Sequence, residues 1–173
     1  NKALGGTGSL VLDRQNKVAY ASLSPRTDIE VLEEFSKISG YQLVTFKSQD
    51  RNHALIYHTN VMMSIGDEFA VVCPDSIEDQ QEREKVINSL RISNKKIIPI
   101  SLTQTYSMCG NILQVKNIKG DKKIIMSKRA FEGFTKEQRE DLGKYGMIVS
   151  VDIPTIETIG GGSARCMLAE IFY

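Results

Sequence analysis

The sequence predicts an α/β chain of the α+β type, with three ββαβ units followed by one last strand. Two observations lead to this prediction. One order of patterns (two β-type runs, a capped helix and another β-type run) occurs three times, and successive units begin roughly 50 residues apart, a spacing typical of repeat arrays. The composition agrees with a buried core, because 41% of the 173 residues are hydrophobic and 25% are charged.

The first unit is expected to contain strands at residues 9–12 and 18–21, a helix at 28–39 and a strand at 41–46. Thr27 is a suitable N-cap with Glu30 three residues later, and Gly40 ends the helix. Apolar side chains at spacings of three predict that one face of this helix is buried. These side chains are Ile29, Leu32, Phe35 and Ile38.

The second and third units repeat this order. The second is expected as strands at 61–65 and 69–73, a helix from 77 to about 90, and a strand at 97–100. The third is expected as strands at 112–115 and 123–126, a helix ending near 142, and a strand at 147–151. Each helix has a capping pair three residues apart, Ser76 with Asp79 in one and Thr135 with Gln138 in the other.

The last β-type run covers residues 164–172 and follows three glycines at 160–162. A strand needs a neighbour, and this run has none within a unit. We therefore expect a circular array in which the run pairs outside the three units. It would pair with an absent N-terminal segment or be exchanged with a second copy, which would give a homodimer. An ordinary α+β sandwich is the alternative.

Charge and cysteine content exclude several classes of function. The 22 basic and 21 acidic residues give a net charge of +1, so neither a nucleic-acid nor a membrane-surface partner is expected. No apolar run approaches the roughly 20 residues that cross a bilayer, and no signal-peptide pattern opens the chain, which predicts a cytoplasmic location. The three cysteines are widely spaced, so we expect no disulfide, metal or cofactor. The start without Met suggests a fragment of a longer protein.

Cys166 is the strongest candidate for a reactive group. It follows the glycines at 160–162, whose amides can point at a ligand, and Arg165 precedes it, which favours a thiolate. The alternative is a flexible loop before a structural cysteine. Cys73 lies in an apolar run and is predicted to be in the core, while Cys109 is a lesser candidate that would line the same cavity.

His58 and Arg26 are the other candidates. His58 stands at the entrance of a predicted strand, where it could transfer protons for a thiol nucleophile. A structural histidine is the alternative, and His53, in a polar run, is predicted to be a solvated loop residue. Arg26 precedes a helix and could bind a carboxylate with two hydrogen bonds. Pairing of Arg26 with Asp28 is equally compatible with the sequence.

Five segments together resemble the amidinotransferase, or pentein, superfamily, and most closely its bacterial citrulline-utilisation hydrolases. These segments are Gly6-Thr7-Gly8-Ser9, Ser24-Pro25-Arg26-Thr27, Tyr57-His58-Thr59-Asn60-Val61-Met62-Met63, Cys109-Gly110-Asn111 and Gly160-Gly161-Gly162-Ser163-Ala164-Arg165-Cys166-Met167. The resemblance implies a ring of five ββαβ units, an α/β propeller, of which residues 1–173 form the C-terminal part of a single domain.

The resemblance also implies a chemistry and its residues. Cys166 matches the nucleophile that attacks the guanidino or ureido carbon of an arginine-like or citrulline-like amino acid, and His58 matches the general acid and base. Arg26 stands where deiminases direct an arginine at the substrate carboxylate. Asn60 replaces their aspartate, and its amide can donate to a carbonyl oxygen, which suits the ureido group of citrulline.

One position departs from the family pattern. Gly5 stands where the family usually has a glutamate, so the imidazole of His58 lacks its carboxylate, and the resemblance implies impaired turnover in this chain. A non-catalytic pentein that binds a ligand is therefore the second hypothesis. A papain-like thiol peptidase, which needs an asparagine partner and a different order of elements, is the third.

Overall fold

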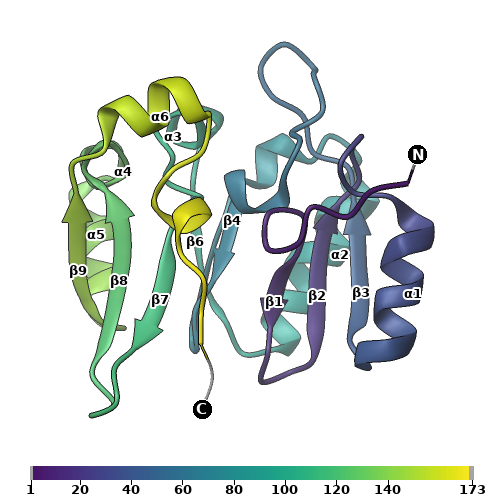
Figure 1. Cartoon of the computed structure of the whole chain (residues 1–173), viewed down its shortest axis with the longest axis horizontal. Helices are drawn as coiled ribbons and strands as arrows, with labels where there is room; N and C mark the ends of the chain where they lie inside the picture. Colours follow the sequence, from purple (N-terminus) through teal and green to yellow (C-terminus); the bar gives the residue numbers. More distant parts are fainter. Residues whose placement is uncertain (1, 172–173) are drawn as a thin grey trace.

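The computed structural model describes residues 2–171 and contains three three-stranded sheets, one for each predicted unit (Figure 1). In every unit the first two strands are antiparallel, and the third strand pairs in parallel with the second after a helical crossover. The predicted ββαβ order is therefore confirmed. The first strands of the units lie next to one another, whereas closure into a five-unit ring stays a prediction.

The first unit consists of β1 (Val11–Asp13), β2 (Val18–Ser22), α1 (Ile29–Ser39) and β3 (Gln42–Phe46). All five residues of β2 are buried, because one face packs on the second unit and the other on α1. The N-cap of α1 is Asp28, whose carboxylate accepts from the Glu30 N–H, and not Thr27 as predicted. The apolar face is narrower than predicted, since Leu32 is fully buried but Ile38 is 81% exposed.

The second unit consists of β4 (Met63–Ile65), β5 (Phe69–Val72), α2 (Gln80–Ile92) and β6 (Lys96–Pro99). Its helix begins later than predicted, because Asp79 is the N-cap and Ser76 belongs to the short helix η2 (Pro74–Ser76). Strand β4 also begins two residues late. The 3₁₀ helix η1 (Thr59–Val61) occupies the start of that predicted strand.

The third unit consists of β7 (Leu113–Lys116), β8 (Lys122–Ser127), α5 (Lys136–Gly143) and β9 (Met147–Val151). Its predicted capping box is confirmed: Thr135 accepts from the Gln138 N–H and the Gln138 side chain accepts from the Thr135 N–H. Three short helices were not predicted. They are α3 (Leu102–Tyr106), α4 (Lys128–Gly133) and α6 (Pro154–Gly160).

The last β-type run does not form a strand. Its start is the 3₁₀ helix η3 (Ala164–Met167), and residues 168–171 carry no secondary structure; residue 172 lies outside the described part. Local hydrogen bonds explain the difference, because the N–H groups of Cys166 and Leu168 donate to carbonyls three residues earlier. The prediction of a strand at 164–172 is therefore wrong for its described residues.

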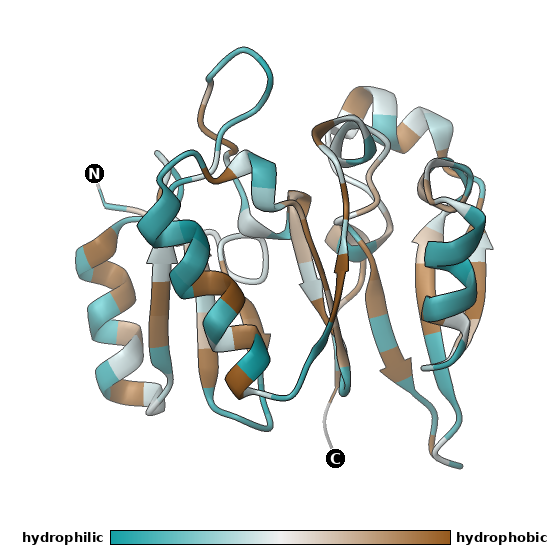
Figure 2. Ribbon diagram, turned by 180° about the vertical axis from the view of Figure 1, so that it is seen from behind, coloured by the Kyte–Doolittle hydropathy of each residue, from teal (hydrophilic) through white to brown (hydrophobic). Residues whose placement is uncertain are grey.

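One hydrophobic cluster of buried residues extends through all three units, and a smaller one lies beneath α1. The helices on the face seen in Figure 2 carry many hydrophilic residues, while the strands behind them are largely hydrophobic. No helix within residues 2–171 is long and apolar enough to cross a membrane.

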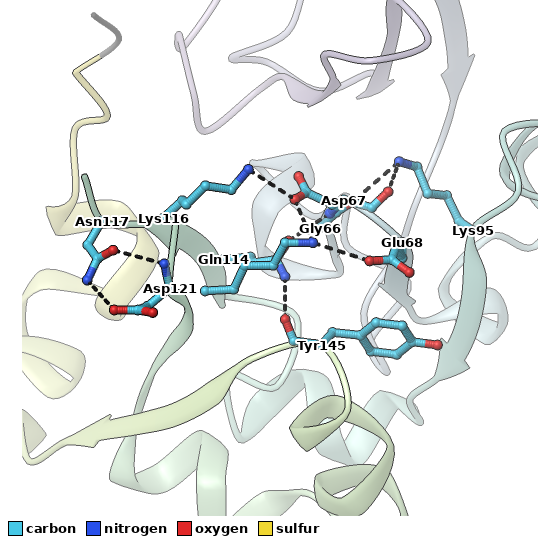
Figure 3. A network of polar contacts seen from close by, with 10 residues as sticks. Gly66, Asp67, Glu68, Lys95, Gln114, Lys116, Asn117, Asp121 and Tyr145 are labelled. Atoms are coloured by element: carbon cyan, nitrogen blue, oxygen red, sulfur yellow. Dashed lines mark hydrogen bonds and ion pairs between the residues drawn. The ribbon is translucent and has the colours of Figure 1, made fainter. Parts of the chain in front are cut away.

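Polar contacts hold the second and third units together at one turn (Figure 3). The Gln114 side chain accepts from the Asp67 N–H at 2.7 Å and donates to the Tyr145 carbonyl at 2.8 Å. The ammonium of Lys122 lies 3.0 Å from Asp67 and 3.2 Å from Glu68. The connection between β4 and β5, residues 66–68, therefore joins β7 and β8 of the third unit to the second unit.

A buried ion pair joins the first and second units. Lys95 Nζ lies 3.3 Å from Asp13 Oδ2, and both side chains are 1% exposed. The same ammonium donates to the carbonyls of Gly66 and Asp67, and Asp13 accepts from the backbone and side chain of Asn16. Both buried charges therefore have several protein partners.

Removing one charge of this pair should cost more than removing both. Lys95→Met leaves the Asp13 carboxylate buried without its counter-ion, so we expect the free energy of unfolding to fall by about 3 kcal/mol or more. Asp13→Leu combined with Lys95→Met should cost less than the sum of the single changes. Urea unfolding of the four proteins measures this, and strictly additive losses would show that the two groups do not interact.

Candidate active site

The sulfur of Cys166 lies at the meeting point of three segments distant in sequence. Cys166 is in η3 and is exposed. Its Sγ lies 3.2 Å from Nδ2 of Asn111, just before β7, and 3.7 Å from Nδ2 of Asn60, in η1. The structure therefore brings two of the predicted site residues, Cys166 and Asn60, together, and adds a third residue.

The position of η1 follows from its contacts with the glycine-rich segment before β1. The Thr59 hydroxyl donates to the Ser9 carbonyl at 2.6 Å and accepts from the Ser22 N–H at 2.8 Å. The Asn60 N–H donates to the Gly8 carbonyl at 3.1 Å. His58 is the N-cap residue of η1, so these bonds also hold the backbone beside His58 in place.

The His58 imidazole lies against two glycines. A β-carbon at position 8 would lie 2.6 Å from Nδ1 of His58, and one at position 5 would lie 2.8 Å from Nε2, both too close for the ring as it stands. Burial lowers the pKa of His58, and the charge of Arg26 lowers it further. Both effects on the pKa favour the neutral imidazole. No hydrogen bond to the His58 ring is found within residues 2–171.

Tyr57 connects the histidine to the cysteine loop. Its ring centre lies 4.8 Å from that of His58 and 5.7 Å from the guanidinium carbon of Arg26. Its hydroxyl donates to the Gly161 carbonyl at 2.6 Å. Burial raises the pKa of Tyr57, the nearby Cys166 raises it further, and Arg26 lowers it. Arg26 itself is exposed before α1, so its guanidinium is accessible beside this tyrosine.

The other two cysteines are not at this site. Cys73 is buried, as predicted, and Cys109 is buried with its thiol donating to the Ala130 carbonyl at 3.4 Å. Burial raises the pKa of Cys109 to about 12. The expectation that Cys109 lines the cavity of Cys166 is therefore wrong, because the side chain two residues later occupies that place.

Arg165 is buried rather than extended over the thiol. Its Nε has no hydrogen-bond partner within the described residues 2–171. Burial lowers the pKa of the Arg165 guanidinium, whereas Glu170 and Cys166 raise it. The backbone N–H of Arg165 donates to Asn111 Oδ1 at 3.1 Å. Stabilisation of a Cys166 thiolate by the charge of Arg165 stays a prediction.

Sequence reasoning missed the roles of Asn111 and Tyr57, although both stand in motifs that the sequence showed. The glycine at position 110 is the only feature of the local sequence that indicates a special place for Asn111. A β-carbon there would lie 2.3 Å from the Val61 carbonyl oxygen, so only glycine lets the chain approach η1 this closely. That Cys166, His58, Arg26 and Asn60 act together on one substrate stays a prediction.

The three ββαβ units, together with the family match that follows, place the chain in the pentein-type amidinotransferase superfamily. A protein-family model described as "N,N dimethylarginine dimethylhydrolase, eukaryotic" matches residues 1–173, and the chain belongs to this family. No curated protein sequence matches the chain.

Solved structures of the same fold are distant in sequence. ArgZ, an arginine dihydrolase of the ornithine-ammonia cycle in cyanobacteria, superposes with a TM-score of 0.71 at 18% identity, covering 93% of this chain and 23% of ArgZ. A substrate-bound variant of its N-terminal domain gives 0.68 at 18% identity, covering 92% and 54%. Agmatine deiminase of C. jejuni gives 0.56 at 16% identity, covering 96% and 55%. The chain thus spans about a quarter of ArgZ and about half of the domain.

Cys166 should alkylate much faster than the other cysteines. The thiolate is the reacting species, and a pKa of about 12 leaves Cys109 on the order of 10⁻⁵ ionised at pH 7. Iodoacetamide labelling of the folded chain, with each cysteine followed by mass spectrometry, should modify Cys166 first. Cys166→Ala should abolish the fast phase. Equal labelling of all three cysteines would contradict an activated thiol.

The His58 imidazole should titrate below its ordinary value of 6.5. Both causes, burial and the Arg26 cation, disfavour the imidazolium. Replacing the cation by Arg26→Gln removes a repulsion, so the midpoint should rise toward 6.5. NMR titration of the histidine ring protons measures this, with His53→Gln to assign the two signals. A midpoint that does not move in Arg26→Gln would exclude the electrostatic contribution.

Proposed function

We propose that this chain belongs to a thiol-dependent hydrolase that acts on the ureido or guanidino carbon of a citrulline-like or arginine-like amino acid. The main support is the Cys166 sulfur, which lies between the side-chain amides of Asn60 and Asn111. The thiol is exposed, and Tyr57, which contacts His58 and Arg26, is hydrogen-bonded to the loop before Cys166. A thiol nucleophile with a histidine as its acid and base is a common form of covalent catalysis.

The proposed reaction has two covalent steps. The Cys166 thiolate attacks the planar carbon, and His58, as imidazolium, gives its proton to the departing amine nitrogen while the carbon–nitrogen bond breaks. The carbon is then bound to sulfur. Neutral His58 next accepts a proton from water, whose oxygen attacks this carbon, and the carbon–sulfur bond breaks to return the thiolate.

Two further residues would select the substrate. Arg26, exposed beside the site, would bind the α-carboxylate of an amino acid. Asn60 is 2% exposed and is neutral. Its amide can donate to a ureido oxygen and accept from a ureido nitrogen, whereas a carboxylate would be needed to neutralise a guanidinium. We therefore favour citrulline over arginine as the substrate, in line with the citrulline-utilisation hydrolases that the motifs resemble.

We further propose that residues 1–173 are the C-terminal part of one pentein domain. In a five-unit ring, two more ββαβ units would complete the wall around the substrate. The lengths of the solved pentein domains, about twice that of this chain, support this proposal.

A non-catalytic binding protein is the second candidate, and Gly5 favours it. The N–H of Gly5 donates to Ser9 Oγ and to the Arg26 carbonyl, so the residue keeps a structural role. It has no carboxylate, however, to hold His58 or support the imidazolium. A site that cannot protonate the leaving amine could bind an amino acid without cleaving it.

Turnover of citrulline by the chain should therefore be weak, and Gly5→Glu should raise it. A carboxylate there raises the pKa of His58, and loss of general acid catalysis typically costs about 10²–10⁴-fold. Gly5→Gln is the matched control, because it displaces the His58 ring equally without the charge.

The measurement is amine and ammonia release from citrulline, arginine and agmatine, with Cys166→Ala as the blank. Because the proposed five-unit ring would add two units to the substrate site, the same variants are also tested in the longer parent protein that this proposal implies. Brisk turnover with Gly5 in place would show that the carboxylate is dispensable. Binding of citrulline without turnover in Gly5→Glu, in the chain and in the parent, would support the second candidate.

A further inference from the structure

The side chain of Asn111 joins the three segments of the thiol site. It is 1% exposed. Its Nδ2 donates to the Cys166 sulfur at 3.2 Å and to the Asn60 carbonyl at 3.0 Å, and its Oδ1 accepts from the Arg165 N–H at 3.1 Å. Each hydrogen of the amide therefore has an acceptor, and its oxygen has a donor.

This orientation of the Asn111 amide is the only one that its neighbours allow. If the oxygen and nitrogen were exchanged, the oxygen would face the Cys166 sulfur and the Asn60 carbonyl, and both are acceptors when the sulfur is ionised. The nitrogen would face the Arg165 N–H, which is a donor. Leaving buried polar groups unpaired in this way is costly. The Nδ2 donor of Asn111 is therefore held toward the Cys166 sulfur.

The other asparagine at the sulfur is held less tightly. Both amide atoms of Asn60 are near Cys166 Sγ, with Nδ2 at 3.7 Å and Oδ1 at 3.9 Å. Within the described residues, the other side-chain hydrogen bond of Asn60 runs from Nδ2 to the Thr7 carbonyl, at 3.3 Å. The two amides therefore differ. Oδ1 of Asn111 accepts from a backbone N–H at 3.1 Å, whereas the contact of Asn60 Oδ1 with the Cys166 sulfur is long, at 3.9 Å.

We propose that Asn111 is a positioning residue of the thiol site, which favours the thiolate of Cys166 by donating to its sulfur and fixes the loop by accepting from Arg165. A thiolate is a stronger acceptor than a thiol, so the contact gains strength when Cys166 ionises. The inference rests on the proposed function only in taking Cys166 as the nucleophile.

The pH dependence of Cys166 alkylation in the folded 173-residue chain tests this proposal. In Asn111→Leu the donor is lost without adding a charge, so the midpoint of the profile should move up by about one pH unit and the rate at pH 7 should fall about tenfold. In Asn111→Asp the acceptor for the Arg165 N–H remains. The midpoint should move further, because an anion faces the sulfur, while the plateau rate at high pH stays near that of the parent.

Asn52→Leu, in an exposed loop, is the matched control and should leave the profile unchanged. Unchanged midpoints in both folded Asn111 variants would overturn the proposal, because a residue that only shapes the loop would alter the plateau alone. If the variants fail to fold, NMR of the unsubstituted chain decides. The side-chain amide signals of Asn111 should titrate with the midpoint of Cys166 alkylation, and signals that do not titrate would overturn the proposal.

These readouts use no substrate, so they are separate from the test of turnover. A chain that shows the Asn111-dependent profile and cleaves neither citrulline nor arginine would retain this inference and count against the proposed hydrolase. A chain that cleaves citrulline through Cys166 with a profile independent of Asn111 would retain the hydrolase and exclude this role of Asn111.

Discussion

The hydroxyl of Thr59 is the contact on which the site depends. Fully buried, it donates to the Ser9 carbonyl before β1 and accepts from the Ser22 N–H at the end of β2. It thereby fixes the 3₁₀ turn η1 against the first unit, although η1 leads into the second. The backbones of its chain neighbours, His58 and Asn60, are therefore held against the first unit as well. A site made of loops thus obtains its geometry from one buried side chain and the rigid sheet behind it.

Local patterns predicted the repeated part of the fold well. The parallel third strand of each unit, the capping box of Thr135 and Gln138 and the buried strands follow from period, turn residues and caps, which act over a few residues. Boundaries were less accurate where two caps competed, as with Ser76 and Asp79. The prediction of a strand at 164–172 was wrong over its described residues, because a β-type composition does not reveal the local backbone hydrogen bonds of η3. In addition, the Arg165 N–H donates to the side chain of Asn111 and not to a neighbouring strand.

The candidate site was only partly predictable, because it depends on contacts between segments that are distant in the sequence. Cys166, His58, Arg26 and Asn60 could be selected from their chemistry and motifs, and the structure places Asn60 at the sulfur. The role of Asn111 could not be selected in this way, because an asparagine after a glycine is also an ordinary turn signal. Its role depends on Gly110 packing against the Val61 carbonyl, a contact between segments about 50 residues apart that no local pattern encodes.

The charges around the sulfur connect the proposed substrate preference to the proposed weakness in catalysis. Arg26 and Arg165 bring positive charge, and within residues 2–171 no carboxylate is hydrogen-bonded to His58, Asn60 or Cys166. Under the proposed function, this positive charge would disfavour a cationic guanidinium, so a neutral ureido group would fit the site better. The same absence of carboxylates disfavours the imidazolium of His58, whose proton the leaving amine needs. In the proposed mechanism, a positive potential stabilises the Cys166 thiolate but destabilises the His58 imidazolium. A single carboxylate beside His58, on the side away from the sulfur, would stabilise the imidazolium and destabilise the thiolate least.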